Sequence, residues 1–128
     1  MAFHLLIVDD SAVMRDFIVR VIEISGLDIG TCLQASNGQE ALALLRSNWI
    51  DIVLTDVNMP VMNGEQFVGC MEKDEMLRTI PVLVISTDGS ECRVQRMMSL
   101  GAKAYVKKPF SPELLRKSME QLLGVSND

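Results

Sequence analysis

Hydrophobic residues alternate along the chain between two patterns. Short runs that are apolar at nearly every position are typical of buried strands, and they are separated by longer segments whose apolar residues recur every three or four positions, as in amphipathic helices. Because strands and helices alternate from end to end, we expect an α/β fold, a doubly wound parallel sheet with five strands, five helices and right-handed crossovers. The predicted strands are residues 5–8, 29–35, 52–54, 82–85 and 104–106.

Polar residues with capping chemistry mark where helices should begin. Asn37 with Glu40, and Asn63 with Gln66, have the spacing of a capping box, in which two side chains bond reciprocally to the backbone of the first turn. Ser111 precedes a proline, which is favoured at the first position of a helix. These signals predict helices after the second, third and fifth strands.

Length and charge restrict the function further. A chain of 128 residues is the size of one domain, so we expect a single domain over residues 1–128. A net charge of −5 without a dense Lys/Arg run argues against direct nucleic-acid binding. No apolar run approaches the roughly 20 residues of a membrane span, and acids follow the N-terminus too soon for a signal peptide. We therefore expect a cytoplasmic protein without a membrane partner.

The cysteines and the histidine do not indicate a metal site. Three cysteines without a CxxC motif and one histidine provide no zinc-ligand pattern, so we interpret the thiols as reduced packing residues.

Charged and hydroxyl side chains follow the predicted strands at the point where each strand should end. Ligands of an open parallel sheet bind beyond the carboxyl ends of its strands, so these side chains should face one crevice. They are Asp9 and Asp10 after the first strand, Asp56 after the third, Ser86 and Thr87 after the fourth, and Lys107 and Lys108 after the fifth.

Three carboxylates in one crevice require compensation. At an effective dielectric constant near 20, two such charges about 4 Å apart repel by about 4 kcal/mol. Lys108 can supply one positive charge, and Mg²⁺, which prefers oxygen ligands, can supply the rest. Asp56 stands alone and is the better nucleophile for an aspartyl-phosphate, whereas Asp9 and Asp10 form a pair suited to hold a metal.

Each of these residues also has a structural interpretation. The pair Asp9 and Asp10 could simply cap the following helix, Asp56 could be a turn residue before Pro60, and Lys108 could be a solvated loop lysine. The functional hypothesis depends on their joint position at one edge of the sheet.

Four motifs, in order along the chain, resemble a known family. They are IVDDS at residues 7–11, LTDVNMPVMNG at 54–64, PVLVIST at 81–87 and AYVKKPF at 104–110. With them the chain resembles the receiver domain of response regulators in two-component signalling, in its single-domain, CheY-like form. The resemblance implies a flavodoxin/CheY-like fold with strand order 2-1-3-4-5.

The resemblance also implies a role for each site residue. Asp56 is the expected acceptor of a phosphoryl group from the phosphohistidine of a sensor histidine kinase. Asp10 and Asp56 are the expected direct ligands of Mg²⁺, Asp9 is expected to reach the metal through water, and Asn58 is expected to lend its backbone carbonyl. Lys108 is the expected partner of the phosphoryl group, and its peptide bond to Pro109 is expected to be cis.

A switch is the second implication of the resemblance. The hydroxyl of Ser86 should follow the phosphoryl group, and Tyr105 should then turn inward and repack the surface of the fourth helix, fifth strand and fifth helix, about residues 90–123. The alternative for Tyr105 is a half-buried tyrosine whose hydroxyl faces water. Thr87 is bulky for its position and could hinder this motion. The polar residues expected on the switch surface are Arg93, Arg96, Tyr105 and Lys107.

The lifetime of the phosphorylated state is expected to depend on two further residues. Asn58 and Asp88 stand where relatives tune the approach of the hydrolytic water. An amide and an acid could orient that water, so we expect fast self-dephosphorylation.

The expected partners are the kinase and either a downstream target, such as a flagellar switch protein, or a phosphotransfer protein. The protein should be a monomer or a weak, phosphorylation-dependent dimer. It would not be a turnover enzyme in the usual sense, because it would catalyse only its own phosphorylation and dephosphorylation.

Three alternatives stay open. A phosphatase of the haloacid dehalogenase kind would need a second acid at position 58, where the chain has Asn. The chain could also be the receiver fragment of a larger response regulator, or a degenerate receiver that only binds partners.

Overall fold

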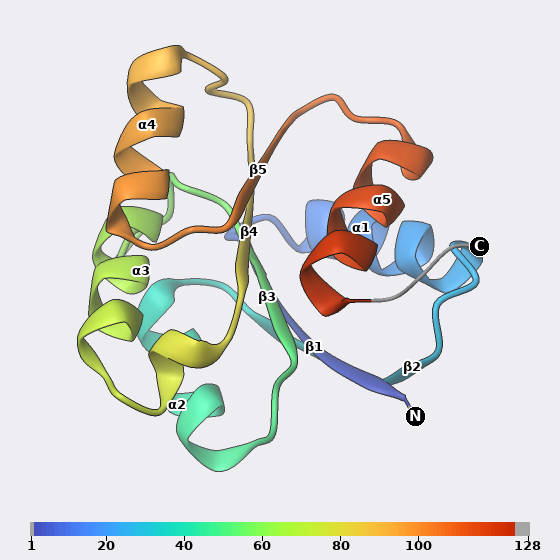
Figure 1. Ribbon diagram of the computed structural model, residues 1–128, viewed down its shortest axis with the longest axis horizontal. Helices are drawn as coiled ribbons and strands as arrows, with labels where there is room; N and C mark the ends of the chain where they lie inside the picture. The colour runs from blue at the N-terminus through green and yellow to red at the C-terminus, as the bar shows by residue number, and fades with distance from the viewer. Residues whose placement is uncertain (1, 125–128) are drawn as a thin grey trace.

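The computed structural model describes residues 2–124 and contains five strands and five α-helices in alternation (Figure 1). The predicted fold class is confirmed, and the observed strands include every predicted residue and extend by up to two residues at their ends. A short 3-10 helix, η1 (Leu77–Thr79), was not predicted. The other elements are β1 (Phe3–Val8), α1 (Ala12–Ile24), β2 (Ile29–Ala35), α2 (Gly38–Ser47), β3 (Ile52–Thr55), α3 (Gly64–Lys73), β4 (Val82–Ser86), α4 (Glu91–Leu100), β5 (Ala104–Lys107) and α5 (Pro112–Leu123).

The sheet is parallel throughout and has the order β2-β1-β3-β4-β5. The chain leaves β1 toward β2 on one side and then returns to place β3 on the other side of β1. The strand order therefore reverses between β1 and β3, and the carboxyl ends of these two strands border the crevice where such sheets bind ligands.

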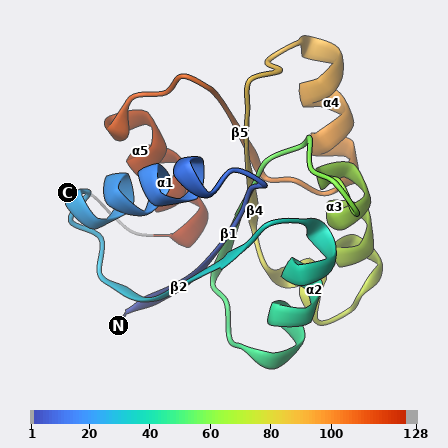
Figure 2. The same ribbon diagram turned by 180° about the vertical axis from the view of Figure 1, so that it is seen from behind.

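Two helical layers cover the sheet. Helices α1 and α5 lie over one face, and α2, α3 and α4 lie over the other, as the two opposite views show (Figures 1 and 2). Side chains of β1 alternate between the layers: Leu5 and Ile7 join the core under α1 and α5, whereas Leu6 and Val8 join the other core. Because both faces are covered, the central strands need apolar residues at every position, which explains their unbroken hydrophobic runs.

The predicted helix starts are present. Asn63 forms a complete capping box with Gln66. Asn37 accepts the Glu40 N–H at 2.9 Å, but the Glu40 carboxylate bonds to Ser36 instead of returning to Asn37. The predicted box of Asn37 and Glu40 is therefore only half formed, because Ser36 offers both a backbone N–H and a hydroxyl to Glu40.

Candidate functional site

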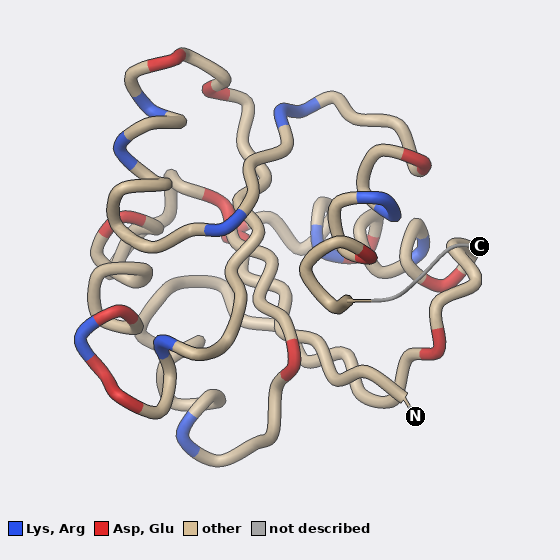
Figure 3. The backbone as a smooth tube through the Cα atoms, in the orientation of Figure 1, with Lys and Arg blue, Asp and Glu red and all other residues tan. Residues whose placement is uncertain are grey.

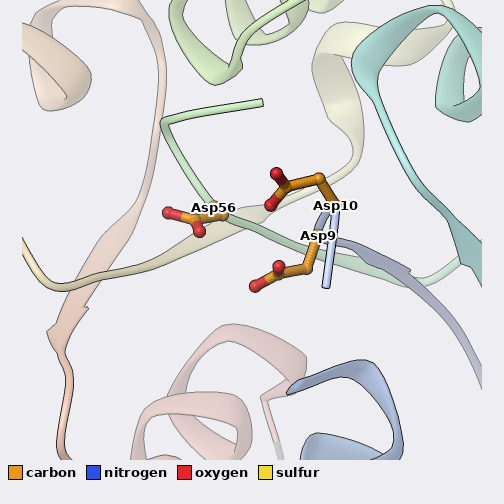
Figure 4. Close-up of side chains that lie close together, drawn as sticks. All are labelled: Asp9, Asp10 and Asp56. Carbon is orange, nitrogen blue, oxygen red and sulfur yellow. The ribbon is translucent and has the colours of Figure 1, made fainter. Parts of the chain in front are cut away.

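Asp9, Asp10 and Asp56 meet at the carboxyl ends of β1 and β3. One carboxylate oxygen from each lies within 4.8 Å of the others, and Figure 4 shows the three side chains gathered around one space. Parallel pairing sets this arrangement, because the register places Val8 opposite Thr55 and the Asp56 N–H donates to the Val8 carbonyl at 2.9 Å. Asp9 is buried, Asp10 is exposed and Asp56 is intermediate, so the cluster extends from the core to the surface.

Neither Asp9 nor Asp10 caps helix α1. Ser11 is the N-cap, and its hydroxyl accepts the Met14 N–H at 3.2 Å. The Asp9 carboxylate instead accepts the Ser11 N–H at 2.9 Å and thereby stays turned toward the crevice. The purely structural interpretation of this acid pair as a helix cap is therefore wrong.

Lys108 lies between two of the acids. Its Nζ is 3.1 Å from Asp9 Oδ2 and 3.2 Å from Asp56 Oδ2. The lysine side chain is only 10% exposed, Asp9 is 4% and Asp56 is 14% exposed, so this is a buried ion-pair group and not a solvated loop lysine. The Lys108 N–H donates to the Ser86 carbonyl at 2.8 Å, and the peptide bond from Lys108 to Pro109 is cis, as predicted.

One ammonium cannot neutralise three carboxylates. Within residues 2–124, no cation lies within ion-pair distance of Asp10, and Lys108 is shared by Asp9 and Asp56. Burial raises the pKa of Asp56 above its ordinary value, although Lys108 acts in the opposite direction and the Val57 N–H also stabilises the carboxylate. The crevice is therefore short of positive charge, which is the condition for binding a hard cation.

Gly64 fixes the loop that carries Asp56. A Cβ atom at Gly64 would lie 2.4 Å from the Asp56 carbonyl oxygen and 2.8 Å from the Val57 Cα, distances that only glycine avoids. The Gly64 N–H also donates to the Val57 carbonyl at 2.7 Å. The sequence marked this position only as a helix start and did not reveal that α3 begins against the backbone of Asp56. Asn58 lies exposed in the same loop.

The predicted switch residues Ser86 and Tyr105 both contact Asp88 in the loop between β4 and α4. The Ser86 side chain is fully buried, and its hydroxyl accepts the Asp88 N–H at 3.2 Å. Tyr105 packs against the core under α2, α3 and α4, and its hydroxyl donates to the Asp88 carbonyl. Burial raises the pKa of the Tyr105 phenol above its ordinary value. The interpretation of Tyr105 as a tyrosine with a water-facing hydroxyl is therefore wrong. Thr87, the bulky residue that follows Ser86, is exposed.

Asp88 also takes part in an ion-pair chain that the sequence did not reveal. Its carboxylate accepts the Ser90 N–H at 3.1 Å and the Arg93 Nε–H at 3.4 Å, and these bonds lower the pKa of Asp88. Arg93 Nη1 also lies 2.6 Å from Glu65 Oε1 on α3, and Arg96 Nε lies 3.6 Å from the same oxygen. Both arginines are therefore drawn toward α3, while Lys107 on β5 is exposed. Elsewhere, acidic and basic residues are interspersed along the chain (Figure 3).

Comparison with known proteins decides the family. The sequence profile described as "Response regulator receiver domain" matches residues 5–120. The chain belongs to this family. It is a CheY-like receiver domain of a two-component system, and the predicted resemblance is confirmed.

Relatives of this receiver domain include free-standing chemotaxis proteins. The chain is 36% identical over 124 residues to "Chemotaxis protein CheY1" of Helicobacter pylori (strain ATCC 700392 / 26695), covering 96% of this chain and 98% of that protein. The structure of chemotaxis response regulator CheY4 of Vibrio cholerae is similar with a TM-score of 0.83 and 32% identity, over 96% of this chain and 100% of that one.

Receiver domains with the same fold also occur in other proteins. The signal receiver domain of a signal transduction histidine kinase from Syntrophus aciditrophicus has a TM-score of 0.85 and 30% identity to this chain, over 99% and 95% of the two chains. Receiver domains bind Mg²⁺ at an acidic site and interact with histidine kinases and downstream targets. Within residues 2–124, no helix is long and apolar enough to cross a membrane.

Proposed function

We propose that Asp56 accepts a phosphoryl group from the phosphohistidine of a sensor histidine kinase in a Mg²⁺-dependent reaction. The observation that carries this proposal is the placement of Asp56 at the meeting point of two other carboxylates and Lys108. Asp9 is less accessible, with a side chain 4% exposed, and Asp10 has no contact with the lysine. Of these three acids, only Asp56 combines partial exposure with a cation beside its carboxylate.

The acidic cluster fits a magnesium ion. Its donors are carboxylate oxygens, which Mg²⁺ prefers, and they are close enough together for one ion to serve them. Asp10 and Asp56 would bind the ion directly, Asp9 through water and Asn58 through its backbone carbonyl. When bound, Mg²⁺ would neutralise the surplus carboxylate charge and coordinate phosphoryl oxygens.

The residues of the chain would divide the transfer between them. A carboxylate oxygen of Asp56 forms the new bond to phosphorus while the P–N bond of the phosphohistidine breaks, and the electron pair of that bond returns to the imidazole nitrogen. Lys108 Nζ, 3.2 Å from Asp56 Oδ2, can follow the charge from the carboxylate to a phosphoryl oxygen. The Ser86 hydroxyl accepts the Asp88 N–H, so its own proton is free to be donated to another oxygen of the phosphoryl group.

Output and reset follow from the same site. Movement of Ser86 would act on Tyr105 through Asp88, and so on the surface formed by α4, β5 and α5. This surface would bind a downstream target or a phosphotransfer protein.

We infer a cytoplasmic protein that works as one receiver domain over residues 1–128, as a monomer or a weak dimer. Relatives named as chemotaxis proteins support a chemotaxis pathway. The domain would catalyse its own dephosphorylation, with Asn58 and Asp88 setting the rate.

Labelling with a small phosphodonor tests the proposal. Incubation with acetyl phosphate and Mg²⁺, followed by intact-protein mass spectrometry, should show one acid-labile phosphoryl group on the wild type and none on Asp56→Asn. Asp51→Asn is the matched control, because Asp51 directly precedes β3 whereas Asp56 directly follows it, and this variant should be labelled like the wild type. Full labelling of Asp56→Asn would place the nucleophile elsewhere. Multiple turnovers of a small phosphate ester would favour a phosphatase instead.

A further inference from the structure

Asp88 connects both residues of the proposed switch. Its N–H donates to the Ser86 hydroxyl at 3.2 Å, and its carbonyl accepts the Tyr105 hydroxyl. Tyr105 is therefore turned inward, and this arrangement requires the Asp88 carbonyl to stay in place. A loop residue needs further contacts to hold that position.

Arg93 supplies the contact that ties Asp88 to another element. Its Nε donates to the Asp88 carboxylate at 3.4 Å, and its Nη1 donates to Glu65 Oε1 at 2.6 Å. The planar guanidinium can make both bonds at once, which a lysine cannot do with the same geometry. The three side chains are 28–38% exposed, so their charges are only partly screened by water.

Glu65 extends this connection to the loop of the phosphoacceptor. It is the second residue of α3 and directly follows Gly64, whose close approach to the Asp56 carbonyl fixes the start of that helix. The chain Glu65–Arg93–Asp88 thus runs from the rigid end of the Asp56 loop to the acceptor of the Tyr105 hydroxyl. Arg96 also contacts Glu65, at 3.6 Å, but its side chain is 58% exposed and its ion pair does not include Asp88.

We propose that Arg93 is a positioning residue that holds the Asp88 carbonyl for Tyr105 and so biases the unphosphorylated protein toward the inward state. A two-state protein that is already partly in its active arrangement needs less energy from phosphorylation to complete the change. The signalling consequence rests on the proposed function, but the positioning itself does not involve the phosphoryl group.

The single tyrosine gives a direct readout. Full-length protein labelled with meta-fluorotyrosine will show one protein resonance in fluorine NMR, and the solvent-isotope shift of this resonance between H₂O and D₂O reports exposure of Tyr105. In Arg93→Ala we expect a larger isotope shift and a chemical shift closer to that of free fluorotyrosine. Glu65→Gln should move the resonance in the same direction by less. Arg96→Ala is the matched control and should leave it unchanged.

Further variants separate this inference from the proposed function. Circular dichroism checks that each variant is folded, and Glu65→Gln, which preserves side-chain size, provides the test if Arg93→Ala does not fold. An unmoved resonance in folded Arg93→Ala and Glu65→Gln would overturn the inference, even if Asp56 is labelled. Movement of the resonance in Arg93→Ala, made also in an Asp56→Asn background, would support the inference even if labelling of Asp56 fails.

Discussion

Carboxylates at the two ends of the parallel sheet have different kinds of partner. At the amino end, Asp51 precedes β3 and accepts the His4 N–H at 2.7 Å and the Trp49 Nε1–H at 3.0 Å. Two neutral donors satisfy this acid, and within the described residues no cation pairs with it. At the carboxyl end, three acids approach within 4.8 Å of one another, and Lys108 pairs with two of them, Asp9 and Asp56.

This difference shows which carboxylates serve the fold. Asp51 joins β1 to the segment before β3, and its two donors satisfy its carboxylate without a cation. Its charge is therefore compatible with a purely structural role. The carboxyl end carries more negative charge than its single lysine can balance, which lowers stability without improving packing. Charge retained at such a cost indicates a site that needs a cation.

The largest effect is expected at the carboxyl end, from Lys108→Met. This change leaves Asp9 and Asp56 buried side by side without their cation, so the free energy of unfolding should fall by about 3 kcal/mol in the absence of Mg²⁺. Urea denaturation monitored by circular dichroism measures the loss. An unchanged midpoint would mean that Lys108 does not stabilise the acids.

A smaller effect is expected at the amino end, from Asp51→Ala. Removing this carboxylate leaves the His4 N–H without its acceptor, and the free energy of unfolding should fall by about 1.5 kcal/mol. The same denaturation experiment, repeated with saturating Mg²⁺, should give the same difference from the wild type. If Mg²⁺ restored the stability of this variant, the contrast between the two ends would be wrong.

The smallest effect, of opposite sign, is expected from Asp56→Asn. The pKa of Asp56 is raised in the folded protein, so as the pH rises from the ordinary value of 3.8 the unfolded chain loses its proton first. The folded wild type therefore loses stability across the interval up to the folded pKa and stays at the lower level above it. Asp56→Asn lacks this loss.

The pH dependence of the two proteins tests the sign. Without Mg²⁺, Asp56→Asn should be more stable than the wild type at pH 7, and the difference should shrink as the pH falls below 3.8. The gain should stay below the loss in Lys108→Met, because the lysine already offsets part of the penalty on Asp56. A variant that is less stable than the wild type at pH 7 would contradict a raised pKa.

The sequence predicted the fold because burial on both faces leaves an unambiguous hydrophobic signal. It also predicted the acidic edge, since the carboxyl ends of parallel strands must meet and Asp9, Asp10 and Asp56 follow such ends. Strand limits were less accurate. Thr55 and Ser86 are polar yet continue their strands, because the strand is defined by backbone hydrogen bonds that hydropathy does not report.

Contacts that depend on how helices sit against one another could not be predicted. Arg93 and Glu65 are 28 residues apart, and their 2.6 Å bond requires the relative rotation of α3 and α4. The same is true of Gly64, whose proximity to the Asp56 carbonyl appears only once the loop has closed. The choice of Ser11 over its acidic neighbours as the cap of α1 was also open, because Ser and Asp side chains both accept hydrogen bonds from a helix start.

Magnesium titration of the folded domain tests the central claim most directly. The unfolding free energy of the wild type should rise with Mg²⁺ concentration, by about 2.7 kcal/mol at one hundred times the dissociation constant. Asp10→Asn should gain clearly less, and Asp51→Asn should gain as much as the wild type. A wild-type denaturation curve that does not move with Mg²⁺ would contradict the assignment of these carboxylates to a metal-dependent phosphoacceptor site.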